Sequence, residues 1–140
     1  MIYSELIKKA MNISFEAHKN DYDKNGYPYF IHPLAVAYDF DDEDLVCIAL
    51  LHDVIEDHGD KYSFEYLKEA GFNDNFINAL KLLTHPKGMD YLTYINNIKN
   101  NPLAKKVKLA DLKHNTNLTR GIKPPKYDLY LKALEILAKD

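Results

Sequence analysis

The chain has 140 residues, 46% of them hydrophobic and 28% charged, a composition typical of one folded domain (1–140) and not of a disordered chain. Its 18 basic and 21 acidic residues give a net charge of −3, which argues against a nucleic-acid-binding or anionic-membrane surface. The single cysteine, Cys47, excludes an intramolecular disulfide, and no apolar run is long enough to cross a membrane. The N-terminal residues lack the apolar core of a signal peptide, so we expect a cytoplasmic protein.

The first forty residues predict two helices joined by a loop. Apolar residues at helical spacing predict a helix that ends near His18 and has one apolar stripe. The stripe consists of Leu6, Ala10, Ile13 and Ala17. Residues 19–31 contain an Asn-Gly pair and a proline, which predict a loop. Pro33 suits the first residue of a short helix that reaches about Phe40.

An acidic run at 41–44 predicts the start of the next helix, because carboxylates there cap free amides and oppose the positive end of the helix dipole. This helix is predicted from Leu45 to about Asp57. It is apolar on all sides at first, which is typical of a buried central helix.

Capping residues and helix breakers predict five further helices. Their predicted starts are Ser63, Asn73 or Asp74, Asp90, Asn101-Pro102 and Pro124-Pro125. No strand pattern of useful length occurs in the sequence. The predicted fold class is therefore all-α, a single helical bundle of about eight helices.

The segment 50–57 concentrates chemistry-bearing residues at the end of the apolar helix. His52, Asp53, Glu56 and Asp57 are predicted to lie on one side of it, because residues four apart are neighbours on a helix. Three carboxylates and an imidazole are costly to desolvate together unless a bound cation compensates. The alternative is that the helix emerges into water here, with its last carboxylates solvated. The segment alone leaves both interpretations open.

Two other positions favour the cation. His32 precedes Pro33 at a predicted helix start, where a histidine can also be a structural or capping residue. Asp111 interrupts an apolar patch, although it could also pair with Lys108. Together with His52 and Asp53 they form a nitrogen and oxygen ligand set suited to one divalent ion such as Mn²⁺, Fe²⁺, Zn²⁺ or Co²⁺. The absence of thiolates argues against a structural zinc site.

Four motifs follow one another along the chain: KxGxPYxxHP at 24–33, LLHDxxED at 50–57, LT at 83–84 and KLADxxxN at 108–115. In this order they resemble the hydrolase domain of RelA/SpoT-type proteins, which belongs to the HD metal-dependent phosphohydrolase superfamily. The similarity is greatest to the small stand-alone alarmone hydrolases and extends over nearly the whole chain.

The resemblance implies an all-α HD fold and a small nucleotide as the binding partner. The implied ligands of a Mn²⁺ ion are His32, His52, Asp53 and Asp111. The implied catalytic pair is Glu56 and Asp57. The implied substrate contacts are Lys24, Asn115, Lys87 and Tyr130. The implied reaction removes the 3′-pyrophosphate of ppGpp or pppGpp, giving GDP or GTP and pyrophosphate.

The sequence departs from this family at two places. Asp23 stands where the family has a base-stacking arginine, and Thr116-Asn117 replaces a common Leu-Arg pair. We expect the Asp23 side chain to face solvent. If it instead faced the base, its carboxylate would favour guanine. Other substrates, such as NADPH or an adenosine alarmone, stay open, as does a non-catalytic nucleotide sensor, against which the acidic pair argues. The other histidines are expected to be structural or solvated: His18, His58, His85 and His114.

Overall fold

Nine α-helices and one 3₁₀ helix make up the regular structure of residues 1–139, the part of the chain that the computed structural model describes. The α-helices are α1 (Glu5–His18), α2 (Ile31–Tyr38), α3 (Glu43–Leu51), α4 (Val54–His58), α5 (Phe64–Glu69), α6 (Asp74–Leu83), α7 (Tyr91–Ile98), α8 (Pro102–Asn115) and α9 (Tyr127–Ala138). The 3₁₀ helix η1 spans Leu118–Arg120. No strand occurs within 1–139, where Tyr22 and Pro28 form an isolated bridge. The predicted all-α class is confirmed.

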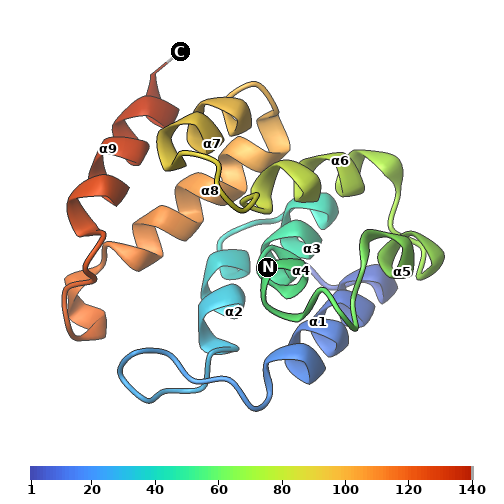
Figure 1. Ribbon diagram of the computed structural model, residues 1–140. Helices are drawn as coiled ribbons and strands as arrows, with labels where there is room; N and C mark the ends of the chain where they lie inside the picture. The colour runs from blue at the N-terminus through green and yellow to red at the C-terminus, as the bar shows by residue number, and fades with distance from the viewer. Residues whose placement is uncertain (140) are drawn as a thin grey trace.

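Helix α3 lies at the centre and packs against α1, α2, α6 and α8. Every residue of α3 from Leu45 to Leu51 is buried, as its apolar character on all sides predicts. Figure 1 shows α7, α8 and α9 together on one side of the molecule and α1 and α5 on the other. None of the helices within 1–139 has the length and hydropathy of a membrane-spanning segment.

Five of the predicted helix starts are confirmed by their capping hydrogen bonds. In each case a side-chain oxygen accepts a hydrogen bond from a backbone N–H three residues later, which satisfies an amide that the helix itself leaves free. The caps that do so at predicted positions are Asp42, Ser63, Asn73, Asp90 and Asn101. These caps fix where each helix enters the bundle.

The prediction of one continuous helix from Leu45 to Asp57 is wrong. A turn at His52 and Asp53 separates α3 from α4, and Asp53 has φ −103° and ψ −5°. The turn allows neighbouring side chains to face the same way, so that Nε2 of His52 lies 3.0 Å from Oδ2 of Asp53. On a straight helix, successive side chains point about 100° apart. The break between α3 and α4 thus coincides with the contact between His52 and Asp53.

Helix α2 begins two residues before the predicted Pro33, at Ile31. Backbone N–H groups of Ile31 and His32 donate to the carbonyls of Pro28 and Tyr29, which forms the first turn. Pro33 is still in that turn, where its missing N–H costs no helical hydrogen bond. His32 is consequently a buried residue of the first helical turn.

The burial of α3 predicts a large loss of stability on truncation. Leu50→Ala should lower the free energy of unfolding by about 2–5 kcal/mol, because Leu50 is fully buried and its removal leaves a cavity. Leu131→Ala is the matched control: Leu131 is 42% exposed and its loss should cost about 0.5 kcal/mol or less. Urea unfolding followed by circular dichroism measures both. Equal losses for the two variants would contradict the central position of α3.

Candidate metal centre and active site

Four side chains from three parts of the bundle converge beneath the surface. His32 comes from α2, His52 and Asp53 from the turn after α3, and Asp111 from α8. Nε2 of His32 lies 2.8 Å, and Nε2 of His52 lies 3.3 Å, from the same oxygen, Oδ1 of Asp111. Oδ2 of Asp53 lies 3.0 Å from Nε2 of His52 and 3.8 Å from Nε2 of His32. The structure thus brings together the predicted ligand set.

The outer nitrogen of each imidazole is held by the protein. Nδ1 of His52 donates to the carbonyl of Ala49 at 2.6 Å. Nδ1 of His32 lies 2.7 Å from Nδ1 of His114, whose ring stacks on that of His32. Burial and the charges of His32 and Arg120 lower the pKa of His114 to about 4, so its ring is neutral and can accept this hydrogen bond. Both Nε2 atoms are therefore aimed at the carboxylates, as metal-binding imidazoles require.

The two carboxylates are held in place as well. The hydroxyl of Tyr29 donates to Oδ2 of Asp53 at 2.6 Å. Oδ2 of Asp111 accepts from the Lys108 ammonium at 2.8 Å, and its Oδ1 accepts from the Asn115 amide at 3.2 Å. The predicted alternative for Asp111, a pair with Lys108, therefore exists together with the histidine contacts.

Charge balance in this cluster calls for a cation. Burial alone would lower the pKa of His52, but Asp53 and Asp111 raise that pKa well above its usual value. Burial alone would raise the pKa of Asp111, but Lys108 and the two histidines hold it well below its usual range. The carboxylates are thus ionised, and either a proton on imidazole or a divalent ion can supply the missing positive charge.

The donor set fits such an ion. His32, His52 and Asp53 each place a donor atom within 4.8 Å of the others. Ligand atoms about 2.1 Å from a metal and at right angles lie about 3 Å apart, close to the separations that the imidazoles make with Asp111. Two nitrogens and two oxygens without thiolate suit Mn²⁺, Fe²⁺, Co²⁺ or Zn²⁺.

Glu56 borders this centre and Asp57 does not. A polar cavity of about 220 Å³ is lined by Asp53, Asp111 and Glu56 among others. Oε1 of Glu56 accepts the backbone N–H of His85 at 2.7 Å. Asp57 instead lines a neighbouring open depression, which Glu56 also borders. The carboxylates of this segment thus border two adjoining depressions, and the break at 52–53 interrupts the single helix on which the prediction placed them.

Burial raises the pKa of both acidic residues. For Glu56 the cause is burial and then the nearby Asp53 carboxylate. For Asp57, burial together with Asp53 and Glu56 raises the pKa to about 6. With a pKa of about 6, the Asp57 carboxyl can exchange protons during a reaction.

A larger cleft of about 630 Å³ shares Tyr29, His32, Asn115 and Tyr130 with the polar cavity, so the two adjoin. Three of the four predicted substrate contacts line this cleft: Lys24, Asn115 and Tyr130. Lys87 is exposed and lines neither the cavity nor the cleft. Its role as a substrate contact stays a prediction.

Sequence reasoning missed Arg120, the only arginine of the chain. It lines the cleft, and its Nη1 donates to Oδ1 of Asn115 at 3.1 Å and to the carbonyl of His114 at 3.0 Å. Arg120 is the last residue of η1, a segment without apolar periodicity, so the only available signal was that arginine is rare in this sequence. Lys108, which lines the polar cavity, was predicted only as a partner of Asp111.

Asp23 stabilises the loop between α1 and α2 through hydrogen bonds to its backbone. Its Oδ1 accepts the backbone N–H groups of Asn25 at 2.9 Å and Tyr27 at 3.0 Å. The residue is partly buried and lines the cleft, so it is less solvated than the sequence predicts. Because one of its oxygens already serves the loop, Asp23 keeps a single oxygen for a bound molecule.

The model of the HD domain family matches residues 29–116, a range that includes all four converging residues. The chain belongs to the HD domain family. Its relatives include a probable GTP pyrophosphokinase of Mycobacterium leprae, 30% identical over 135 residues (86% of this chain, 17% of that protein). A guanosine-3′,5′-bis(diphosphate) 3′-pyrophosphohydrolase of Haemophilus influenzae is 32% identical over 133 residues (81% of this chain, 19% of that protein).

Among solved structures, the chain is similar to a metazoan orthologue of SpoT that is described as hydrolysing ppGpp and playing a role in starvation responses. The TM-score is 0.77 at 22% identity, and the match covers 98% of this chain and 85% of the other. This similarity confirms the predicted HD fold. The chain spans less than a fifth of the length of the two curated relatives above.

The raised pKa of Asp57 predicts a pH dependence of stability. The folded metal-free protein should keep a proton up to about pH 6, which an unfolded aspartate releases near pH 4. This stabilisation is complete below about pH 4 and is lost as the pH rises through about 6. Urea unfolding of chelator-treated protein at several pH values should show this loss, and Asp57→Asn should remove it. The exposed Asp39 gives a control variant, Asp39→Asn, which should follow wild type. Identical pH profiles for all three proteins would show that Asp57 titrates normally.

Proposed function

We propose that this chain is a divalent-metal-dependent hydrolase that removes the 3′-pyrophosphate of ppGpp or pppGpp, giving GDP or GTP and pyrophosphate. The observation that carries the proposal is the convergence of His32, His52, Asp53 and Asp111 beside Glu56, next to a cleft with cationic walls. The names of the Haemophilus influenzae relative and the metazoan orthologue support the same reaction.

The proposed metal ligands are Nε2 of His32, Nε2 of His52 and the carboxylates of Asp53 and Asp111. Mn²⁺ is the proposed ion, since mixed imidazole and carboxylate ligands suit it and the resembling hydrolases use it. When bound, such an ion lowers the pKa of a water ligand and withdraws charge from a phosphoryl oxygen.

Glu56 is the proposed general base. Its Oε1 is held by the His85 amide, which orients the carboxylate toward the polar cavity. From there it can take a proton from the attacking water as the oxygen bonds to the phosphorus next to O3′. The bond from that phosphorus to O3′ breaks, O3′ takes up a proton and pyrophosphate leaves. Asp57, which titrates near neutral pH beside Glu56, can pass protons between the site and solvent.

The remaining residues bind and orient the nucleotide. Lys108 in the polar cavity, and Lys24 and Arg120 in the cleft, supply positive charge for the phosphates. Tyr130 borders both spaces and offers a ring face to the base or ribose. Since Oδ1 of Asp23 is engaged by its loop, we expect only weak selection between guanine and adenine.

A nucleotide panel tests the proposed reaction. The purified chain with Mn²⁺ is incubated with ppGpp, the adenosine 3′-pyrophosphate analogue and NADPH, and both pyrophosphate and phosphate are measured. The proposal expects pyrophosphate and GDP from ppGpp. Release of phosphate from NADPH alone would assign the site to a phosphatase. Binding of ppGpp without any product would make the chain a sensor, and either result would overturn the proposal.

The proposed ligands predict a specific loss of metal. His52→Gln should reduce Mn²⁺ bound at the cluster to background and abolish turnover, because one of two nitrogen ligands is lost. His85→Gln is the matched control: the ring of His85 bonds to the carbonyl of Met89 and to none of the four proposed ligands, so Mn²⁺ should stay. Elemental analysis after dialysis, with an anomalous difference map at the manganese edge, measures occupancy. Mn²⁺ retained at this position in His52→Gln would refute the ligand assignment.

The proposed role of Glu56 as the base predicts a loss of turnover without a loss of bound metal. Glu56→Gln should lower kcat by about 100-fold or more while Mn²⁺ stays bound, since an amide cannot accept the proton. Asp57→Asn should also slow turnover and retain the metal. Glu65→Gln, at an exposed glutamate of α5, should leave kcat unchanged. Near-normal turnover in Glu56→Gln would remove Glu56 from the mechanism.

A further inference from the structure

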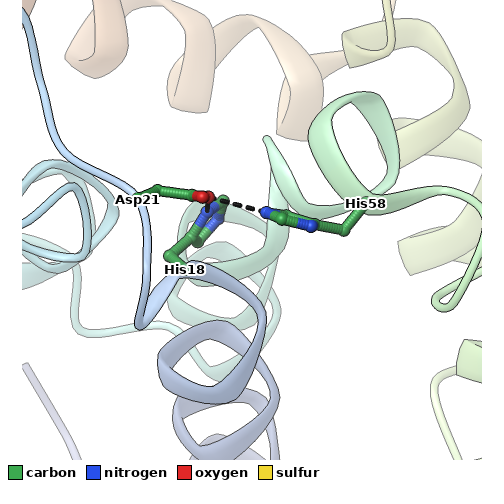
Figure 2. Close-up of side chains that lie close together, drawn as sticks. All are labelled: His18, Asp21 and His58. Atoms are coloured by element: carbon green, nitrogen blue, oxygen red, sulfur yellow. Dashed lines mark hydrogen bonds and ion pairs between the residues drawn. The ribbon is translucent and has the colours of Figure 1, made fainter.

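A second group of histidines and a carboxylate lies outside the proposed metal centre. His18 ends α1, Asp21 is in the loop that follows, and His58 ends α4. Figure 2 shows the His18 ring directly beneath the Asp21 carboxylate and the His58 ring reaching the same carboxylate from the right. Nδ1 of His18 lies 3.2 Å, and Nε2 of His58 lies 2.6 Å, from Oδ2 of Asp21. Packing of α1 against α4 brings the three residues together.

One side of this group is buried in the protein, and the other side faces solvent. The His18 side chain is fully buried, while those of Asp21 and His58 are 32% and 30% exposed. Nε2 of His18 is buried and has no hydrogen-bond partner among the described residues. The polar interactions of this ring are therefore confined to the group. Asp21 and His58 face the open depression that Asp57 also lines, so a small ion and its water ligands can enter.

We propose that His18, Asp21 and His58 bind a second divalent transition-metal ion, with Zn²⁺ as the best match. Two imidazole nitrogens and one carboxylate oxygen, with an open side for water, form a donor set that zinc commonly uses. One donor atom from each residue lies within 4.8 Å of the others. Ligand atoms about 2.0–2.1 Å from a tetrahedral ion lie roughly 3.3 Å apart, so a small opening of the shorter contact accommodates the ion.

This site is separate from the one that the proposed function uses. The Tyr29 ring lies between them, with its centre 4.9 Å from that of His18 and its hydroxyl bonded to Asp53. The two clusters share no donor residue. The second ion would lie next to Asp57, at the edge of the proposed active site, and its binding does not depend on which nucleotide the chain hydrolyses.

Metal stoichiometry tests the inference. The full-length, chelator-treated protein is titrated with Zn²⁺ alone in equilibrium dialysis, and with Co²⁺ to follow visible absorption. Wild type should bind two ions per chain. Asp21→Asn and His58→Gln should each bind one, and His52→Gln should also bind one by losing the other site. The double variant His52→Gln/His58→Gln should bind none. Asp39→Asn, at an exposed aspartate outside both groups, should bind two.

The number of Zn²⁺ ions bound by wild type and by His58→Gln is the decisive comparison, because His58 is not a ligand of the first site. Equal stoichiometry in wild type, Asp21→Asn and His58→Gln would overturn the proposal. If those two variants also had lower melting temperatures, the group would be a hydrogen-bonded structural triad. Because Asp21 and His58 are partly exposed, both variants should fold, and circular dichroism checks that they do.

Discussion

The convergence of two imidazoles on one buried carboxylate oxygen is the constraint around which the rest of this bundle is arranged. Oδ1 of Asp111 lies within 3.3 Å of Nε2 of both His32 and His52. Those three residues come from α8, α2 and the end of α3, so their contact holds three helices in register. Ionic groups at this depth are costly unless each charge has a partner. Lys108, Tyr29 and Asn115 supply such partners.

The apolar helix α3 makes this arrangement possible. Its side chains from Leu45 to Leu51 are buried against the surrounding helices, and this hydrophobic burial offsets the cost of the polar cluster at its end. The turn after α3 then places His52 and Asp53 together, and α4 begins at Val54. Glu56 borders both the polar cavity and the open depression, and Asp57 and His58 line the depression.

The sequence predicted most of the helices, and the four residues that converge in the structure, because both leave strong local signals. Caps such as Asp42 and Asn101 mark helix starts by their side-chain chemistry, and Asp111 is conspicuous as a carboxylate in an apolar stretch. The break at 52–53 was missed because the segment has no glycine or proline. The contacts that His52 and Asp53 make, with Asp111 and Tyr29, involve residues distant in the sequence. Local signals of this kind say nothing about contacts between distant segments.

The cleft and the group of His18, Asp21 and His58 both form through contacts between segments that are distant in the sequence. The bond from Arg120 to Asn115 forms because η1 folds back on the end of α8. His18 and His58 are forty residues apart in the sequence and meet through the packing of α1 on α4. A single histidine at a helix end does not indicate which distant residue it will contact, so both were expected to be structural or solvated.

The fate of the oxygen atom of water tests the central claim most directly. ppGpp is hydrolysed by the Mn²⁺-loaded chain in water labelled with a heavy oxygen isotope, and the products are analysed by mass spectrometry. Attack on the phosphorus next to O3′ predicts that one labelled oxygen enters pyrophosphate and none enters GDP, and that His52→Gln forms neither product. Label in free phosphate or in the nucleotide, or unchanged turnover in His52→Gln, would contradict the account.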